Sequence, residues 1–310
     1  MHRTVLLNEA IEGLNLRENS IVVDGTFGGG GHSLEICKKY PSIKIIAIDQ
    51  DKDALENAKE EFKKNECDIS FFNANFRDLD KVLEKANVKK VDGIILDLGL
   101  SSDQLSPPAG GSGRGFTFLK DESLLMTMKA DPKDEDITAR DVVNTWDEKN
   151  LADIIYGYGE EKFARRIAHG IAEARKNKKI ETTFDLVKII NDCVPAAYKR
   201  GRSRSKLHFA TKTFQAIRIA VNDELGALTE GLKKGFNALR VGGRMSVISF
   251  HSLEDRIVKR FNKEREKESV AKLINKKPIV AGREELKINP RSRSAKLRIL
   301  EKISARGGSA

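Results

Sequence analysis

The stretch that decides the fold is Ile21-Val22-Val23-Asp24-Gly25-Thr26-Phe27-Gly28-Gly29-Gly30-Gly31-His32. A short apolar run ends at Asp24, a glycine-rich turn follows, and residues 33–39 have helical spacing. This is the strand, turn and helix of a doubly wound α/β sheet, in which ligands bind outside the carboxyl ends of the strands. Four consecutive glycines cost conformational entropy, so they favour a loop that a ligand approaches over a purely structural turn.

The spacing of the glycines separates two kinds of cofactor site. The dinucleotide pattern Gly-x-Gly-x-x-Gly fails, because counting from Gly28 and Gly30 its last position is Ser33. The acid before the glycines instead gives Asp-x-small-x-Gly-x-Gly, an arrangement typical of S-adenosylmethionine sites. We therefore predict S-adenosylmethionine as the cofactor, and a nicotinamide dehydrogenase is disfavoured.

Strand and helix signals alternate around this loop. Apolar runs predict strands over 21–23, 43–48, 69–72, 93–96 and 245–250. Helical spacing predicts helices over 33–39, 53–64 and 79–86. Strands that are apolar throughout and separated by helices indicate a parallel sheet covered on both faces.

The pattern changes after Leu105. Residues 107–115 have the composition of a loop, and helices are expected over 138–146, 148–156, 160–176 and 183–194. Thr182 or Thr183 could cap the last of these. A long helical pattern over 209–239, broken near Asn222, leads back to the fifth strand. The sequence thus predicts a sheet domain in two parts, 1–106 and 209–310, and an all-helical insertion at 107–208 with glycine-rich and basic loops.

Composition and charge narrow the class of protein. The chain has 310 residues, of which 39% are hydrophobic and 33% charged, so it can bury a core and is no disordered tail. Residues 251–310 hold 17 Lys and Arg against 8 Asp and Glu, which is +9 of the net +10. Such a concentration indicates a surface for a polyanion, and a lysine-rich solvated face is the alternative.

Other compositional signals point to a cytoplasmic protein without metal. No apolar run is long enough for a transmembrane helix, and the N-terminal residues lack the apolar core of a secretory signal. Cys37, Cys67 and Cys193 are odd in number and far apart, without a Cys-x-x-Cys. We predict neither a disulfide framework nor a zinc site, and a reducing cytoplasm.

Two residues after the glycine loop are candidates for cofactor contacts. Asp49 ends the second strand about 20 residues on, where an acid can accept hydrogen bonds from ribose hydroxyls; capping of the next helix is the alternative, and Asp51 could equally do that. Phe76 follows the third strand and could pack beside an adenine or belong to the core.

The fourth strand ends at Asp97, where the transferable methyl group would meet its acceptor. An exocyclic amine is a poor nucleophile, because its lone pair is conjugated with the ring. An acceptor that holds its N–H restores electron density and receives the proton. Asp97 is the first candidate and the pair Ser101–Ser102 the second, and a structural turn is the alternative.

The fifth strand leads into Ser249-Phe250-His251-Ser252-Leu253-Glu254-Asp255-Arg256. His251 at the strand end could orient a substrate or relay a proton, or be a hydrogen-bonded structural residue. Ser252 with Asp255 resembles a capping box at a helix start. A Ser-His-Asp hydrolase is disfavoured, since Gly-x-Ser-x-Gly is missing.

Two basic segments suit the phosphates of a nucleic acid. Arginines that alternate with serines supply donors on a mobile backbone, and phosphate contacts position a nucleic acid without reading its sequence. No aromatic residues interleave these segments, so base stacking is not indicated; solvated loops are the alternative. The candidate RNA-binding residues are Lys199, Arg200, Arg202, Arg204, Lys206, Arg291 and Arg293.

These motifs together resemble the RsmH (MraW) family of bacterial rRNA methyltransferases, nearly from end to end. The resemblance rests on Val5-Leu6-Leu7-x-Glu9, Gly25-Thr26-Phe27-Gly28-x-Gly30-Gly31-His32-Ser33, Asp92-Gly93-Ile94, Asp97-Leu98-Gly99-x-Ser101-Ser102-x-Gln104-Leu105, Arg114-Gly115-Phe116-Thr117-Phe118, Tyr158-Gly159-Glu160-Glu161, Thr213-Phe214-Gln215-Ala216-x-Arg218-Ile219, the segment Ser249 to Arg256, and Asn289-Pro290-Arg291-Ser292-Arg293-Ser294.

The resemblance implies a class I S-adenosylmethionine-dependent methyltransferase sheet with an inserted helical domain. It implies methylation of the N4 amine of a cytidine in the decoding region of 16S rRNA, on a folded or nearly assembled small subunit, with no obligatory protein partner evident and no membrane. The implied cofactor contacts are Gly30, Gly31, His32, Asp49, Phe76, Asp97 and Gln104.

One segment departs from the family. After Phe118 the family usually has Leu-Asp-Met-Arg-Met-Asp, whereas this chain has Leu124-Leu125-Met126-Thr127-Met128-Lys129. Two acids and an arginine are missing, so a loop there closes differently or the enzyme is less active. The alternatives are an RNA-binding ribosome-assembly factor without catalysis and a DNA or small-molecule methyltransferase. The acid or asparagine followed by prolines and an aromatic, typical of DNA amine methylation, is missing.

Overall fold

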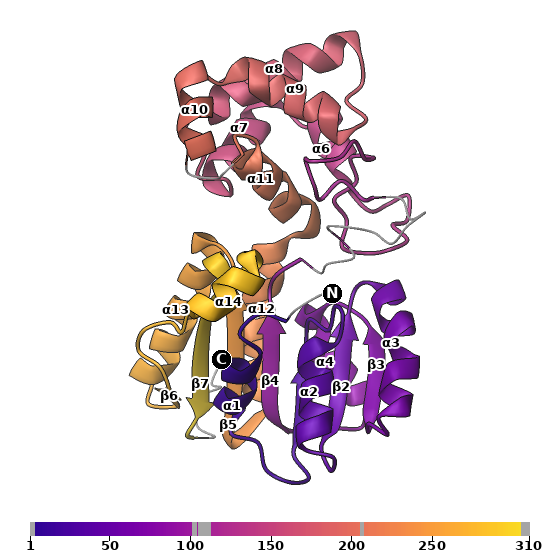
Figure 1. Ribbon diagram of the computed structural model, residues 1–310, viewed down its shortest axis with the longest axis vertical. Helices are drawn as coiled ribbons and strands as arrows, with labels where there is room; N and C mark the ends of the chain where they lie inside the picture. Colours follow the sequence, from indigo (N-terminus) through magenta and orange to yellow (C-terminus); the bar gives the residue numbers. More distant parts are fainter. Residues whose placement is uncertain (1–3, 101–103, 105–112, 205–207, 305–310) are drawn as a thin grey trace. The chain divides into compact units, whose positions relative to one another are not determined.

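A computed structural model describes residues 4–100, 104, 113–204 and 208–304. Its contacts divide the chain into two compact units (Figure 1). The first, called the sheet unit, comprises Met1–Ser101 and Leu225–Ala310, and the second, called the helical unit, comprises Ser102–Glu224. The predicted boundary at 208/209 lies inside the helical unit.

The sheet unit is built on a seven-stranded sheet with the order β3-β2-β1-β4-β5-β7-β6. Its strands are β1 (Ile21–Asp24), β2 (Lys44–Asp49), β3 (Ile69–Asn73), β4 (Val91–Asp97), β5 (Leu239–Ser249), β6 (Ala271–Leu273) and β7 (Lys296–Lys302). The first five run parallel, and β7 pairs antiparallel with β5 and β6. The chain reverses its direction of travel across the sheet between β1 and β4, which is the switch point where α/β sheets bind ligands. The predicted fold class is confirmed.

Helices cover both faces because alternate strand residues point to opposite sides. The helices are α1 (Leu7–Leu14), α2 (Gly31–Lys39), α3 (Lys52–Lys64), α4 (Leu79–Lys85), α12 (Glu224–Ala238), α13 (Ser252–Lys267), α14 (Arg283–Ile288) and the 3-10 turns η1 (Phe76–Asp78) and η2 (Pro290–Ser294). On one face, Val23 and Ile94 pack with α4, α12 and α13. On the other, Val22 and Ile95 pack with α1 and α2. The continuous apolar runs read from the sequence are therefore buried on two sides.

Several elements of the sheet unit escaped the sequence analysis, among them α1, α14, β6 and β7. The segment of β7 looked like part of a basic tail, yet Arg298 and Lys302 are only 8% and 7% exposed. Arg298 pairs with Asp255, and the ammonium group of Lys302 donates to the backbone oxygens of Phe236 and Leu239. Distant partners allow these cations to be buried, and no local pattern reveals such partners.

The helical unit contains α6 (Ala139–Thr145), α7 (Glu148–Gly157), α8 (Ala164–Asn177), α9 (Thr183–Cys193), α10 (Ala196–Arg204) and α11 (Thr211–Asn222). Thr182 caps α9 in a capping box with Asp185, so the first of the two predicted caps is the one used. The prediction of a basic loop over this segment was wrong in part, because residues 196–204 form α10. Helix α11 contacts α7 and α6 and so belongs to this unit.

Asn222, where a helix break is predicted, ends α11, and Asp223 takes the left-handed conformation with φ 44°. The Asn222 side chain accepts from the Met128 N–H at 2.8 Å and donates to the Met126 carbonyl at 2.7 Å. It thereby anchors the segment in which this chain departs from the family pattern. That segment is packed: Leu124 and Met126 are at most 1% exposed.

The prediction of no disulfide was wrong. Cys37 on α2 and Cys67 just before β3 are bonded, with their Cα atoms 5.6 Å apart. They are 30 residues apart in sequence, and α2 and the α3–β3 connection bring them together. Cys193 is free. Among the described residues, no helix has both the length and the apolar character needed to cross a bilayer.

Candidate active site

The glycine loop lies between the carboxyl ends of β1, β2 and β4. Its backbone is bonded to all of these neighbours: Gly25 N–H donates to Ile95 O at 2.9 Å and Phe27 N–H to Ile48 O at 3.0 Å. Gly28 and Gly30 have φ values of 50° and 72°, which residues with a side chain rarely adopt. Gly30 is also the N-cap of α2, and no side chain caps that helix. The loop thus presents backbone and a helix N-terminus at the switch point.

Asp24 anchors the start of this loop, and the sequence analysis left it out of the site residues. It is 1% exposed. Its carboxylate accepts from Ser33 Oγ at 2.7 Å and from the Thr26 N–H at 3.3 Å, which ties β1 to the first turn of α2. Burial raises the pKa of Asp24 to about 6, although both hydrogen bonds oppose the rise. Its position directly before the glycines, as the acid of the Asp-x-small-x-Gly-x-Gly pattern, was the signal that could have identified Asp24.

Asp97 ends β4 beside that loop. Its N–H donates to Thr26 Oγ1 at 2.6 Å, and its carboxylate oxygen Oδ2 lies 3.9 Å from His32 Nδ1. The Asp97 side chain is 22% exposed. Burial is the largest cause of a pKa raised to about 7; a hydrogen bond from the Gly99 backbone opposes it, and the charges of Asp24 and Glu254 add to it. The structure therefore brings together two of the predicted site residues, His32 and Asp97.

The second Asp97 oxygen is an open hydrogen-bond acceptor in the described structure. Oδ1 is buried and has no hydrogen-bond partner among the residues that the structure describes. An unpaired buried acceptor is costly, and such atoms are expected where a ligand supplies the donor. An acceptor with a pKa near 7 can hold an N–H in its ionised form and take up the proton.

Asp49 ends β2 and already binds backbone on both oxygens. Oδ2 accepts from the Gly28 N–H at 2.6 Å and Oδ1 from the Asp51 N–H at 2.8 Å. Burial raises its pKa. Asp51, and not Asp49, caps α3. A carboxylate has about four lone-pair sites, so Asp49 retains acceptor capacity for ribose hydroxyls, and that role stays a prediction.

Phe76 begins η1 after β3 and is half-buried. A Cβ placed on Gly231 of α12 would lie 2.4 Å from the Phe76 ring, and one placed on Gly25 would lie 3.3 Å from the Phe76 Cβ. Phe76 thus packs against α12 and lies next to the glycine loop. Both readings of this residue, adenine contact and core packing, are compatible with its half-buried state.

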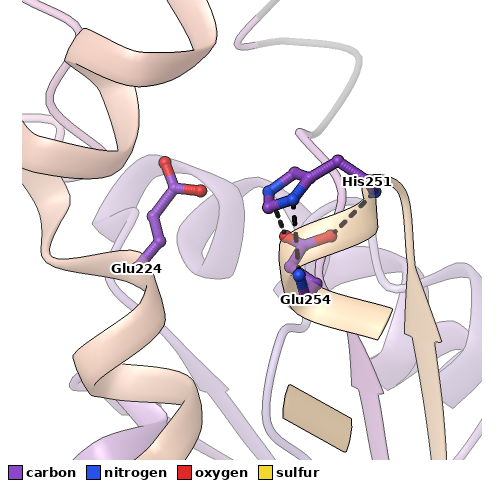
Figure 2. A group of neighbouring side chains, drawn as sticks. All are labelled: Glu224, His251 and Glu254. Carbon is purple, nitrogen blue, oxygen red and sulfur yellow. Dashed lines mark hydrogen bonds and ion pairs between the residues drawn. The ribbon is translucent and has the colours of Figure 1, made fainter. Parts of the chain in front are cut away.

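His251 caps α13 at the end of β5 (Figure 2). Its Nδ1 accepts from the Glu254 N–H at 3.4 Å, while Glu254 Oε2 accepts from the N–H of Phe250 at 2.8 Å and of His251 at 3.2 Å. The predicted capping box of Ser252 and Asp255 was wrong by one residue. Because Glu254 Oε1 also lies 3.2 Å from His251 Nε2, the imidazole is held at the carboxyl edge of the sheet, the edge where the parallel strands end.

The remaining predicted site residues are divided among other places. Gln104 is buried at 8% exposure and belongs to the helical unit. Ser101, Ser102 and Lys206 lie outside the described residues. Their predicted roles stay predictions.

The predicted RNA-binding residues lie on two elements. Arg291 and Arg293 are exposed on η2, which directly precedes β7. Lys199 is half-buried on α10 and donates to the Asn191 carbonyl at 3.2 Å, so it links α10 to α9. Arg200 is exposed on the same helix, which also carries Arg202 and Arg204.

Comparison with known proteins assigns the family. The sequence pattern of the MraW methylase family matches residues 1–303. The chain belongs to this family. Ribosomal RNA small subunit methyltransferase H of Clostridium botulinum (strain Kyoto / Type A2) is 46% identical over 318 residues, covering 97% of this chain and 99% of the relative. The protein of the same name from Sulfurihydrogenibium sp. is 46% identical over 302 residues, with the same coverage. The predicted family is confirmed.

Among solved structures, an rRNA methylase from Streptococcus thermophilus is similar with a TM-score of 0.46 and 12% identity, covering 98% of this chain and 99% of that one.

Proposed function

We propose that this protein transfers a methyl group from S-adenosylmethionine to the N4 amine of a cytidine in small-subunit rRNA. One observation carries the proposal beyond family membership: Asp97 Oδ1 is buried beside a glycine loop at the switch point of the sheet and has no partner among the described residues. It is an acceptor placed for an N–H donor where this fold binds its ligands.

The residues around the loop fit the cofactor. The N-terminus of α2 at Gly31 and His32 offers backbone donors, and Gly30, whose own N–H donates to the Phe27 carbonyl at 2.8 Å, lets the cofactor approach the backbone. The free lone pairs of Asp49 suit ribose hydroxyls. Phe76 lies beside the loop for the adenine, and Gln104 is a further contact that the family resemblance implies. When bound, S-adenosylmethionine supplies an electrophilic methyl group on its sulfonium sulfur.

Asp97 acts on the substrate amine. Its ionised carboxylate accepts an N–H of the amine, which raises electron density on nitrogen, and it takes up the proton that the amine loses after methylation. His32 orients the carboxylate from 3.9 Å away. Ser101 and Ser102 follow β4 in sequence and are second candidates to hold the amine, and His251 is a candidate to orient the base.

The basic segments bind the RNA. Arg291 and Arg293 on η2, and the cations of residues 199–206, would bind phosphates of a folded small subunit, the helical unit forming part of the docking surface. Action on an assembled or nearly assembled subunit, in the cytoplasm, completes the proposal.

The test is incubation of unmethylated small ribosomal subunits with labelled S-adenosylmethionine, followed by digestion to nucleosides. Label is expected in N4-methylcytidine alone. A family member of known activity serves as the positive control. Label in adenosine or guanosine, or no label while the control enzyme works, would contradict the proposal.

A second candidate is an RNA-binding assembly factor without catalysis, and the altered segment at residues 124–129 favours it. Calorimetry with S-adenosylmethionine supports that candidate if no binding is observed. If the cofactor binds, turnover on the subunits decides between the two functions.

Glu254 is expected to tune the pH dependence of the reaction. Its charge raises the pKa of Asp97, so the conservative substitution Glu254→Gln should lower that pKa and move the acid limb of the rate profile to lower pH. Asp24 and His32 also face Asp97 and are unchanged in this variant. Single-turnover rates from pH 5 to 9 measure the shift. A limb that stays in place or moves to higher pH would exclude this role.

A further inference from the structure

One face of helix α13 carries four exposed cations. Its inner face packs on the sheet through Leu253, Val258 and Phe261, while Arg256, Lys259, Arg260 and Lys263 are exposed. These four lie at i, i+3, i+4 and i+7, so they share one side of the helix. We call this set the α13 basic face.

The described acids nearby do not pair with three of these cations, Lys259, Arg260 and Lys263. Asp255 is bound to β7, accepting from Arg298 Nε at 2.7 Å with Lys296 Nζ at 3.3 Å. Glu254 is 3% exposed and bonded to the backbone at the start of α13. Glu264 stands four residues after Arg260 but forms no ion pair with it in the described structure. Among the residues that the structure describes, Lys259, Arg260 and Lys263 have no carboxylate within 4.0 Å.

The arrangement has an energetic cost without a partner. Like charges at i,i+4, such as Lys259 and Lys263, destabilise a helix, and cations in its first half gain nothing from the helix dipole. A polyanion that binds along the face offsets this repulsion with its attraction to each cation. RNA is the polyanion that fits the proposed function, because its row of phosphates complements the row of cations on this face.

The position of α13 connects this face to the proposed site. The helix begins at its N-cap His251, at the carboxyl edge of the sheet. Ser249 of β5 pairs with Lys296 of β7, so η2, with Arg291 and Arg293, enters the sheet at that edge too. The basic face starts about one turn from His251 and runs away from the site.

We infer that the α13 basic face is a phosphate-binding surface that holds the substrate RNA as it leaves the methylation site. The inference rests on the proposed function for its choice of RNA, and it adds a contact outside the two basic segments recognised in the sequence. Phosphate contacts of this kind position the RNA and add affinity without reading bases.

The test is the triple variant Lys259→Gln/Arg260→Gln/Lys263→Gln, measured for binding to unmethylated small subunits at several salt concentrations. Loss of three phosphate contacts should weaken binding about tenfold or more near 0.1 M salt and make the slope of log K against log salt shallower by about 2. The affinity for S-adenosylmethionine should be unchanged, which also shows that the variant is folded.

The matched control is Lys38→Gln/Lys63→Gln/Lys64→Gln. It removes the same charge from exposed lysines at the C-terminal ends of α2 and α3, which face the opposite edge of the sheet. It should bind subunits within about twofold of wild type, since bulk charge acts weakly through salt. If both triple variants weaken binding equally, or neither does, the α13 basic face is no specific surface.

The same experiment separates this inference from the proposed function. Methyl transfer by wild type together with equal behaviour of the two triple variants overturns the inference alone. The opposite outcome is also possible: only the α13 variant loses salt-dependent binding, and wild type transfers no methyl group. That result overturns the proposed function and supports the inference.

Discussion

Replacing Asp97 with asparagine is expected to lower methyl transfer at least about 100-fold, the usual contribution of a positioned acid or base. Asparagine has nearly the same shape and can still accept the hydrogen bond from the Gly99 backbone. It cannot take up the proton of the amine, and its amide carries no negative charge to hold the N–H. Single-turnover kinetics with saturating cofactor measure the loss. A rate within about fivefold of wild type would remove Asp97 from the mechanism.

The same substitution should stabilise the cofactor-free protein at pH 8. The folded pKa of Asp97 is about 7, above its value near 3.9 in an unfolded chain, so folding favours the protonated form. Its contribution to stability is complete below about pH 4 and is lost as the pH rises through 7. The variant has no carboxylate to ionise and should gain about 2–4 kcal/mol over wild type at pH 8.

Urea unfolding at pH 5 and pH 8 tests this. The advantage of Asp97→Asn should be much smaller at pH 5 than at pH 8, because wild type is then mostly protonated at this site. Asp24, whose folded pKa is raised to about 6, loses stability in the same direction in both proteins, and the advantage of the variant at pH 8 includes the lost repulsion between Asp24 and Asp97. If the stability advantage of Asp97→Asn at pH 8 is no larger than at pH 5, the pKa of the buried Asp97 carboxyl is not raised.

The second large effect is expected at Gly30. A Cβ there would lie 2.5 Å from Phe27 Cζ and 3.0 Å from Phe62 Cε2, in a residue whose φ is 72°. Phe27, Phe62 and Phe71 form a packed aromatic cluster, so the rings cannot move aside cheaply. Gly30→Ala should cost about 2–5 kcal/mol of folding free energy from backbone strain and overpacking. Cofactor affinity should fall at least about tenfold as the loop shifts.

Gly242→Ala is the matched control. Gly242 also has a left-handed backbone, with φ 85°, but a Cβ there has no heavy atom within 4 Å. It should lose only about 1–2 kcal/mol from strain and keep its affinity for S-adenosylmethionine. Urea unfolding and calorimetry on both variants give the comparison. Equal losses of stability would mean that strain alone, and not the contact of Gly30 with the aromatic cluster, decides the cost.

The sheet could be predicted from the sequence because its signals are local. Apolar runs that end in Asp24, Asp49 and Asp97 mark parallel strands, and a parallel sheet collects its carboxyl ends on one edge. The break near Asn222 and the cap at Thr182 were local signals too, and the structure has both.

Other features could not be predicted because their partners are distant in sequence. Strand β7 carries cations that are buried by Asp255 and by carbonyls at the end of α12. The bond between Cys37 and Cys67 depends on how α2 and α3 pack. His251 differs from these, because its partner Glu254 is only three residues away: the sequence left a substrate role and a hydrogen-bonded structural role open, and the structure shows His251 as a helix cap.

By itself, the sequence determined the fold class, the family and the residues that follow each strand, since these depend on patterns within a few neighbouring positions. Only the tertiary structure decided the electrostatics. Asp24, Asp97 and Glu254 are far apart in the chain, yet burial of Asp97 and the nearby charges of Asp24 and Glu254 raise its pKa. In the described structure Asp97 Oδ1 has no hydrogen-bond partner. Burial and charge interactions act through space, so a sequence pattern cannot supply them.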